Sequence, residues 1–307
     1  MQKLLIILAF LLGTIACTAQ HQPLYSHYML NGLVVNPAYT GSRGVFTANA
    51  MHRRQWASFE GAPVSQVMSI HGPSKREHLA FGVLVANDRH GVTANTSLSF
   101  SIAYRMKVGA KKSLAFAISG GPQFTTVKFT DVVTVDPNDP SFSNNLRSRI
   151  LPDIGTGIYY SAPRMFAGIA IPGFFKRTYN VADESAQASI DPDNINLIMH
   201  AGYIFGINEN IDIKTSALFR YINYNSRTID LNAVFQYKEH IGAGLSWRLD
   251  NSLVALLEYQ INKQFKIGYA FDYGTGALRS FNAGSHEINL QYEFGFKVKS
   301  FNPREIF

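Results

Sequence analysis

Apolar and polar residues alternate along many short stretches of the chain. Every second residue from Ile229 to Tyr237 is apolar, whereas Asp230, Asn232 and Gln236 lie between them. The same period of two recurs over residues 92–105 and 287–296. Successive side chains of a β-strand point to opposite faces, so this period is typical of strands with one apolar and one polar face. The pattern predicts an all-β protein.

The alternating stretches and the turn residues between them predict fourteen strands. Their expected ranges are 45–52, 64–71, 78–86, 92–106, 113–129, 152–161, 164–171, 196–205, 211–221, 227–237, 240–249, 252–261, 264–272 and 287–296. The number is even, as in single-chain bacterial outer-membrane barrels.

The connections between the expected strands fall into two length classes. The short class follows every second strand and comprises residues 72–77, 107–112, 162–163, 206–210, 238–239 and 262–263. Three of the other connections, 130–151, 172–195 and 273–286, are longer and rich in Pro, Asp, Asn, Ser and Gly, although 248–251 is short. Short turns on one rim and long loops on the other are typical of a transmembrane β-barrel.

Charged residues of the strand interiors lie on the face opposite the apolar residues. They include Arg105, Asp212, Lys214, Arg220, Asp230, Arg248, Glu258, Lys266, Glu287 and Glu293. Alternation alone does not separate a soluble barrel, with its apolar face inside, from a membrane barrel, with that face toward lipid. The loop classes, the even strand number and strands of about ten residues favour the membrane barrel, with these charges in the lumen.

The first nineteen residues have the layout of a secretory signal peptide. A positive start at Lys3 is followed by an apolar run over residues 4–12 and by small residues up to Ala19, after which we expect cleavage. Thr14-Ile15-Ala16-Cys17 also resembles a lipobox, with Thr14 a poor match, and leaves lipoprotein processing at Cys17 as the alternative. Cleavage after Ala19 lowers the net charge from +7 to +6 through loss of Lys3 and removes the single cysteine. No later apolar run is long enough for a membrane helix, which leaves a periplasmic protein or an outer-membrane barrel.

The mature chain is expected to divide into three parts. Residues 20–44 form an N-terminal segment, residues 45–296 the transmembrane barrel and residues 297–307 a C-terminal tail. The N-terminal segment is mostly uncharged, and the spacings Leu24/Tyr28 and Met29/Leu33 are those of one face of a short helix, which Gly32 would interrupt. The segment could fold into the barrel as a plug or remain a partly ordered periplasmic tail.

Aromatic residues gather near the ends of the expected strands. They are Trp56, Phe59, Tyr104, Phe129, Tyr159, Tyr160, Tyr221, Tyr237, Trp247 and Tyr259. This placement is typical of the aromatic girdles of membrane barrels. The alternative is the ordinary preference of aromatic side chains for strands.

Several short motifs along the chain form a characteristic set. They are Asn36-Pro37-Ala38-Tyr39-Thr40-Gly41-Ser42; Arg54-Gln55-Trp56 with Phe59 and Gly61-Ala62-Pro63; Phe81-Gly82 with Asn87-Asp88 and Gly91; Asp136-Pro137-Asn138-Asp139-Pro140; Ile154-Gly155-Thr156-Gly157-Ile158-Tyr159-Tyr160; Ile267-Gly268-Tyr269-Ala270-Phe271-Asp272-Tyr273; and Ser285-His286-Glu287-Ile288. In these motifs the chain resembles the PorP/SprF family of type IX secretion outer-membrane proteins. The motifs occur in order over essentially the whole mature chain. The Asn-Pro-Ala-Tyr segment with the Trp…Gly-Ala-Pro block is the specific part of the resemblance.

The resemblance implies an outer-membrane barrel of the fatty-acid-channel type without enzymatic activity. It further implies that the protein receives, docks or anchors a secreted passenger or adhesin at the cell surface, alongside other type IX secretion components. Some members of the family serve gliding motility. The family brings no catalytic, cofactor-binding or metal-binding residues to transfer. An outer-membrane channel for small or apolar solutes is the alternative function.

Candidate catalytic and metal-binding residues are few. The nine histidines show no His-x-x-x-His spacing, and prolines 137 and 140 break the spacing of a calcium loop around Asp136, Asn138 and Asp139, so a plain turn is expected there. Ser285-His286 and Ser69/His71 are expected to point to opposite strand faces, against a catalytic pair. We therefore expect no enzyme, cofactor or metal. The scattered basic residues suit anionic lipid better than nucleic acid.

Overall fold

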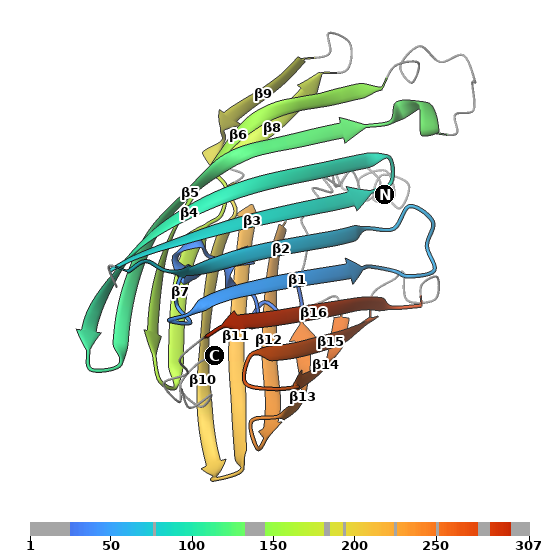
Figure 1. Cartoon of the computed structure of the whole chain (residues 1–307). Helices are drawn as coiled ribbons and strands as arrows, with labels where there is room; N and C mark the ends of the chain where they lie inside the picture. Colours follow the sequence, from blue (N-terminus) through green and yellow to red (C-terminus); the bar gives the residue numbers. More distant parts are fainter. Residues whose placement is uncertain are drawn as a thin grey trace, which may run out of the picture.

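The chain folds into a closed antiparallel barrel of fourteen strands with a separate two-stranded hairpin (Figure 1). The computed structural model describes residues 25–75, 78–132, 145–180, 185–192, 195–223, 226–249, 252–275 and 283–295. The expected signal peptide, the whole C-terminal tail and the Asp136–Asp139 turn lie outside these residues. Within them, all fourteen predicted strands are present, and the fold class is confirmed.

The strands are longer on average than the alternation alone predicts. The barrel strands are β1 (Phe46–Arg54), β2 (Val64–Pro73), β3 (Leu79–His90), β4 (Thr93–Gly109), β5 (Lys112–Val127), β6 (Leu146–Ala162), β7 (Met165–Ile171), β10 (Leu197–Asn208), β11 (Ile211–Asn223), β12 (Ser226–Tyr237), β13 (Ile241–Arg248), β14 (Ser252–Gln260), β15 (Phe265–Gly274) and β16 (Ser285–Phe294). Each pairs with its neighbours in sequence, except that β7 pairs with β10, and β1 pairs with β16 to close the barrel.

The largest departures from the expected ranges lie on one side of the barrel. β6 begins at Leu146, inside the expected 130–151 loop, because pairing with β5 extends to Leu146 opposite Val127. The expected 172–195 loop contains a hairpin of β8 (Phe175–Asn180) and β9 (Ser185–Ile190), which lies beside β6 in Figure 1. Both corrections place strand structure where polar and turn residues predict loops.

We name the two ends of the barrel by their connections. The short-turn rim carries the connections after β2, β4, β6, β10, β12 and β14, and the long-loop rim carries the others. The predicted alternation of lengths holds for the long connections β5–β6, β7–β10 and β15–β16. The β3–β4, β11–β12 and β13–β14 connections at the long-loop rim are short.

The outer face of the barrel is apolar and the lumen is polar. Outward side chains such as Leu245, Phe235 and Ile118 are exposed, whereas inward side chains such as Asp230, Asn232 and Arg248 are buried. Asp212, Arg220, Asp230, Arg248, Glu258, Asp272 and Glu287 are all buried. The predicted division of apolar and charged faces is confirmed.

The aromatic residues near the strand ends do not all face outward. Tyr104, Tyr221, Tyr237, Trp247 and Tyr259 are exposed on the outer face, and Trp247 is 53% exposed. Tyr159, by contrast, is only 4% exposed and faces the lumen, so its assignment to an outer girdle is wrong. Its neighbour Ile158 takes the outward position, because adjacent strand residues point to opposite faces.

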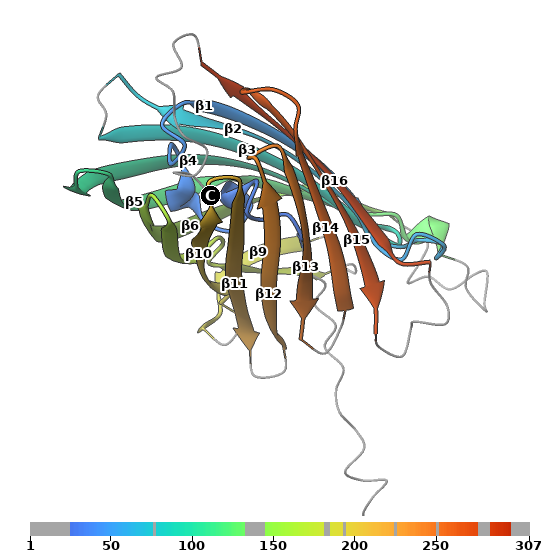
Figure 2. The same ribbon diagram turned by 90° about the horizontal axis from the view of Figure 1, so that it is seen from below.

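Residues 25–42, here called the luminal segment, lie inside the barrel (Figures 1 and 2). All but Val34 and Ser42 are buried. Its apolar residues pack in three clusters against separate parts of the wall. The plug-like arrangement is therefore confirmed for these residues. No helix among the described residues is long and apolar enough to span a membrane.

Candidate functional site: the filled lumen

The luminal segment is built from two single turns rather than the short helix suggested by its spacing. The 3-10 turns η1 (Gly32–Val34) and η2 (Pro37–Tyr39) are separated by Val35 and Asn36. Asn36 caps the second turn, because its Oδ1 accepts a hydrogen bond from the Ala38 N–H at 2.9 Å, and Pro37 occupies the first position of the turn. The Asn-Pro-Ala-Tyr motif thus forms a compact, self-capped turn.

The side chain of Asn36 also fixes this turn to the barrel wall. Its Nδ2 donates to the Ile158 carbonyl at 3.0 Å and lies 3.1 Å from Nε2 of His200. Gly157 and Gly168, on β6 and β7, present no side chain here, and a Cβ on Gly168 would lie 2.7 Å from Asn36 Nδ2. The two glycines allow close approach of the segment to the wall.

Tyr39 of the same turn packs into an aromatic cluster on the barrel wall. Its ring packs edge-on against His71 and Tyr159, with centroid distances of 5.3 and 5.5 Å. Tyr159 in turn stacks on His200 at 5.7 Å. Edge-on and offset packing of aromatic rings is favourable beyond the burial of their area.

Tyr28 anchors the opposite side of the segment. Its hydroxyl lies 2.9 Å from Ser216 Oγ and accepts a hydrogen bond from Asn232 Nδ2 at 2.7 Å. Burial raises the pKa of the Tyr28 hydroxyl, which therefore stays protonated well into the alkaline range. The ring packs with Met29 and Val35 against Leu218 and other apolar luminal residues.

The start of the segment is held by Glu287 of β16. Glu287 Oε2 accepts from the Ser26 N–H and Oε1 accepts from the His27 N–H, each at 2.8 Å. Arg53 of β1 donates to Glu287 Oε2 at 3.3 Å and to Ser26 Oγ at 3.1 Å. Hydrogen bonds to a buried carboxylate are stronger than those between neutral groups.

The same arginine begins a chain of buried ion pairs across five strands. Arg53 Nη2 donates to Asp272 Oδ2 at 2.7 Å, which also accepts from Arg248 Nη1 at 3.0 Å. Arg248 then contacts Asp230 through two hydrogen bonds of 2.9 and 3.1 Å. We call Glu287, Arg53, Asp272, Arg248 and Asp230 the luminal charge chain.

The luminal charge chain holds two guanidinium groups and three carboxylates, so its carboxylates are in excess. A buried charge without compensating partners is costly. Glu287, at one end of the luminal charge chain, receives that compensation from the backbone N–H groups of Ser26 and His27. The barrel wall and the luminal segment are therefore electrostatically complementary.

The predicted inward charges fit this arrangement. Asp230 and Arg248 form an ion pair, and Lys266 Nζ lies 3.7 Å from Glu258 Oε2. Asp212 and Arg220 are buried in the lumen as well. None of these charged side chains faces the apolar outer surface.

The prediction that the side chains of Ser69 and His71 point to opposite faces of the strand is wrong. Both side chains face the lumen, because residues two apart on a strand share a face. They serve the luminal segment separately: Ser69 donates to Asn31 Oδ1 at 3.1 Å, and His71 Nδ1 accepts from the Gly41 N–H at 3.1 Å. Ser285 is buried, whereas the ring of its neighbour His286 bonds to the Tyr269 hydroxyl at 2.8 Å. Across the residues whose placement is described, no group of three metal-ligating side chains occurs.

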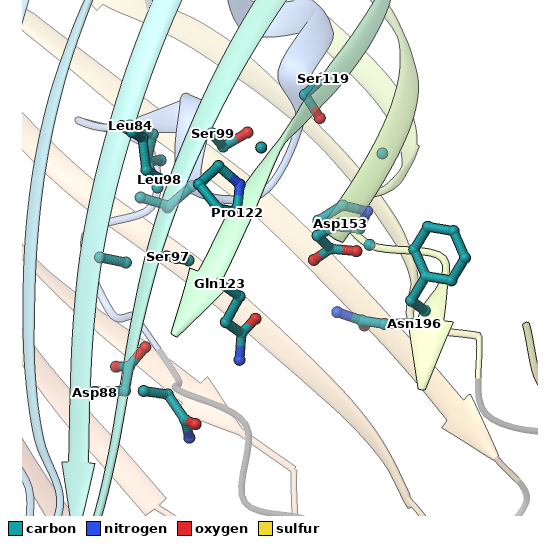
Figure 3. A pocket seen from close by; sticks show the side chains of 18 of the residues that line it. Leu84, Asp88, Ser97, Leu98, Ser99, Ser119, Pro122, Gln123, Asp153 and Asn196 are labelled. Carbon is teal, nitrogen blue, oxygen red and sulfur yellow. The ribbon is translucent and has the colours of Figure 1, made fainter. Parts of the chain in front are cut away.

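A cavity of about 610 Å³ lies beside the luminal segment toward the long-loop rim (Figure 3). Strands β3 to β6 form one side of it, and Tyr25, Leu33, Val34 and Pro37 of the luminal segment form another. Sequence reasoning missed this cavity. The sequence offers one signal for it, the two prolines at positions 122 and 152. Their position opposite each other is known only once the pairing of β5 with β6 is known.

Comparison with solved structures shows similarity to outer-membrane barrels. The monoaromatic hydrocarbon channel CymD aligns with a TM-score of 0.50 and 11% identity over 86% of this chain and 93% of that chain. The Ralstonia pickettii toluene transporter TbuX aligns with a TM-score of 0.49 and 10% identity over 87% and 94%. At these identities, the similarity shows the barrel fold alone. A comparison with curated proteins gave no significant match.

The sequence profile of the type IX secretion system membrane protein PorP/SprF matches residues 17–292. This range includes the luminal segment, the luminal charge chain and nearly all of the barrel. The expected resemblance is confirmed over most of the chain. The chain belongs to the PorP/SprF family of type IX secretion system membrane proteins.

Proposed function

We propose that this barrel docks or anchors a secreted protein, such as an adhesin, at the cell surface. In this proposal the long-loop rim faces outward and contacts the passenger, while the short-turn rim faces the periplasm. The signal peptide directs export, with cleavage after Ala19, and the barrel works beside other secretion components in the outer membrane. The apolar outer face supports contact with membrane lipid.

The observation that carries this proposal is the filled lumen. Residues 25–42 lie inside the barrel and contact most of its circumference, from Glu287 and Asn232 to His200 and His71. A diffusion channel requires a continuous open path, whereas the luminal segment fills the lumen and is fixed by buried hydrogen bonds at both ends. The filled lumen favours a scaffold over an open pore.

The long-loop rim supplies the surface for a partner. The β7–β10 connection carries the β8–β9 hairpin, which contacts β6 and is joined to it by the Phe174 N–H to Ile154 carbonyl hydrogen bond of 2.9 Å. Long connections in compact domains are usually functional. The hairpin is the described part of this rim that is best placed to contact a passenger.

Deletion of the gene tests the proposal. We expect candidate passengers carrying the secretion signal to lose surface attachment and to appear in the medium or accumulate inside the cell. A variant in which a short Gly-Ser linker replaces residues 174–191 should reproduce this loss while the barrel still assembles. A linker in place of residues 261–264 at the short-turn rim is the matched control and should retain the passengers.

The rival function is an outer-membrane channel for small or apolar solutes. The cavity beside the luminal segment is the observation that favours it. If the deletion strain keeps its passengers on the surface but loses uptake of a solute, the docking proposal is wrong and the channel takes its place.

A further inference from the structure

The cavity beside the luminal segment has the size of a small-molecule site and is partly open to solvent. Its volume of about 610 Å³ falls within the range of known ligand pockets. It is bounded by side chains of β3, β4, β5 and β6, by the luminal segment and by a few residues of β8, β10 and β11, among them Phe175 and Arg220, so its walls come from parts of the chain far apart in sequence. Most of its lining residues lie in the half of the lumen nearest the long-loop rim.

Two prolines shape this part of the wall. Pro122 of β5 lies opposite Pro152 of β6, and β5 pairs with β4 on either side of Gly121-Pro122 but not at those two residues. Proline has no backbone N–H, and within sheets it is confined to edges and irregular positions. Recognition of an extended peptide by an added backbone ladder is therefore disfavoured here.

The wall of the cavity is rich in neutral hydrogen-bonding side chains. Alternate residues of β4 and β5 contribute hydroxyl and amide groups, among them Asn95, Ser97, Ser99, Ser101, Ser119 and Gln123. Leu33, Val34 and Pro37 of the luminal segment supply an apolar surface in the same cavity. A ligand that matches both surfaces carries many hydroxyl groups around an apolar ring face.

Two buried acceptors face this cavity without a hydrogen-bond partner among the described residues. They are Oδ1 of Asp88 and Oδ1 of Asn196. In Figure 3 the two side chains stand on different sides of the cavity, with Gln123 between them and Asp153 on the side of Asn196. Buried acceptors of this kind call for donors, and hydroxyl groups are donors that need not carry charge.

The charges that line the cavity balance one another. Asp88 and Asp153 line it together with Lys176 and Arg220, which makes two carboxylates and two cations. Lys176 is paired with Asp191 through an Nζ–Oδ2 distance of 2.7 Å. A lining without net charge favours a neutral ligand over an anionic one.

We propose that this cavity binds a neutral oligosaccharide. Sugar hydroxyl groups donate to Asp88 and Asn196 and exchange hydrogen bonds with the serine side chains, while the apolar faces of the sugar rings pack on Leu33, Val34 and Pro37. The site adjoins the proposed passenger surface, because Phe175 and Lys176 of the β8–β9 hairpin also line the cavity. Its ligand is bound within the lumen, so the proposal stands whether or not the docking function holds.

The test uses the full mature protein in detergent and an array of neutral oligosaccharides, acidic oligosaccharides and Ser/Thr-rich peptides. The best neutral sugar is then titrated by isothermal calorimetry. Asp88→Asn keeps the side-chain size and should weaken binding about tenfold or more, because it replaces a charged acceptor by a neutral amide. Ser99→Phe should abolish binding by filling the cavity. Glu209→Gln, on the short-turn rim, is the matched control and should bind as the parent does.

Assembly of each variant is checked by its heat-dependent mobility on gels and by its far-ultraviolet circular dichroism. Binding of a neutral sugar that Asp88→Asn weakens and Ser99→Phe removes supports the proposal. The proposal is wrong if no neutral sugar binds, if acidic sugars or peptides bind in preference, or if both folded variants bind the sugar unchanged. Passenger retention by Ser99→Phe, measured in cells, separates this result from the docking proposal.

Discussion

Glu287 Oε2 accepts a hydrogen bond from the Ser26 N–H at 2.8 Å, joining the last barrel strand to a residue 261 positions earlier. The bond ties closure of the barrel to the placement of the luminal segment. β16 pairs with β1, and Arg53 of β1 contacts both partners of the bond. Barrel closure and lumen filling are therefore parts of one arrangement.

Glu287→Gln should destabilise the folded barrel by about 3 kcal/mol, since it leaves Arg53 and the luminal charge chain without one buried carboxylate. Urea unfolding in detergent or lipid measures the change. Glu293→Gln on the same strand is the control. Its ion pair with Arg43 is partly exposed, so the loss should be smaller. An equal loss of stability in the two variants would show that Glu287 stabilises the barrel no more than the partly exposed Glu293 does.

Gly168→Val should lower stability by about 1–3 kcal/mol, because the new side chain would enter the space of Asn36 and His200. Ala167→Val, one residue earlier on β7, points outward and should change stability little. Thermal unfolding and protease digestion of the luminal segment measure the two effects. A Gly168→Val barrel as stable as the parent, with its luminal segment still protected, would argue against this anchor.

Ile213→Cys and Lys214→Cys should report opposite environments for a spin label or polarity-sensitive probe. Ile213 lies across from the outward residues Phe205 and Phe235, whereas Lys214 lies across from the buried residues Ile204 and Val234. We expect lipid contact at position 213 and a polar, quencher-accessible environment at 214. The reverse result would mean that the true register of β11 differs by one residue from that of the structure.

Tyr28→Phe should change how stability depends on alkaline pH. Burial raises the pKa of Tyr28 above its ordinary value of about 10, so its contribution is fully present below that pH and is lost as the pH rises further. The parent should therefore lose stability above about pH 10 more steeply than the variant. Tyr237→Phe removes an exposed outer-face tyrosine and should leave the profile of the parent unchanged. If the stability of the parent and of Tyr28→Phe fell equally steeply with rising pH, the burial of the Tyr28 hydroxyl would be contradicted.

The strand pattern was predictable because one face of each strand is apolar throughout. Alternation around Asp230 and Asn232 gives both the strand and the luminal face, and that division holds in the structure. Tyr159 shows the limit of this reasoning: a position near a strand end does not reveal which face an aromatic residue occupies.

Tertiary contacts determine the features that sequence reasoning missed. The partners of Asn36, Ile158 and His200, lie 122 and 164 residues away, and no local pattern connects them. The early start of β6 depends on pairing with β5, because its polar residues read alone resemble a loop. The cavity likewise depends on the pairing that places Pro122 opposite Pro152.

The central claim is that the protein's own N-terminal segment fills the barrel. Conductance of the purified mature protein in planar lipid bilayers tests it most directly, with a variant lacking residues 25–42 as the open-lumen comparison and its insertion checked by gel mobility. We expect the parent to show no steady pore conductance and the inserted deletion variant to conduct. Steady conductance of the parent equal to that of the deletion variant would contradict the account.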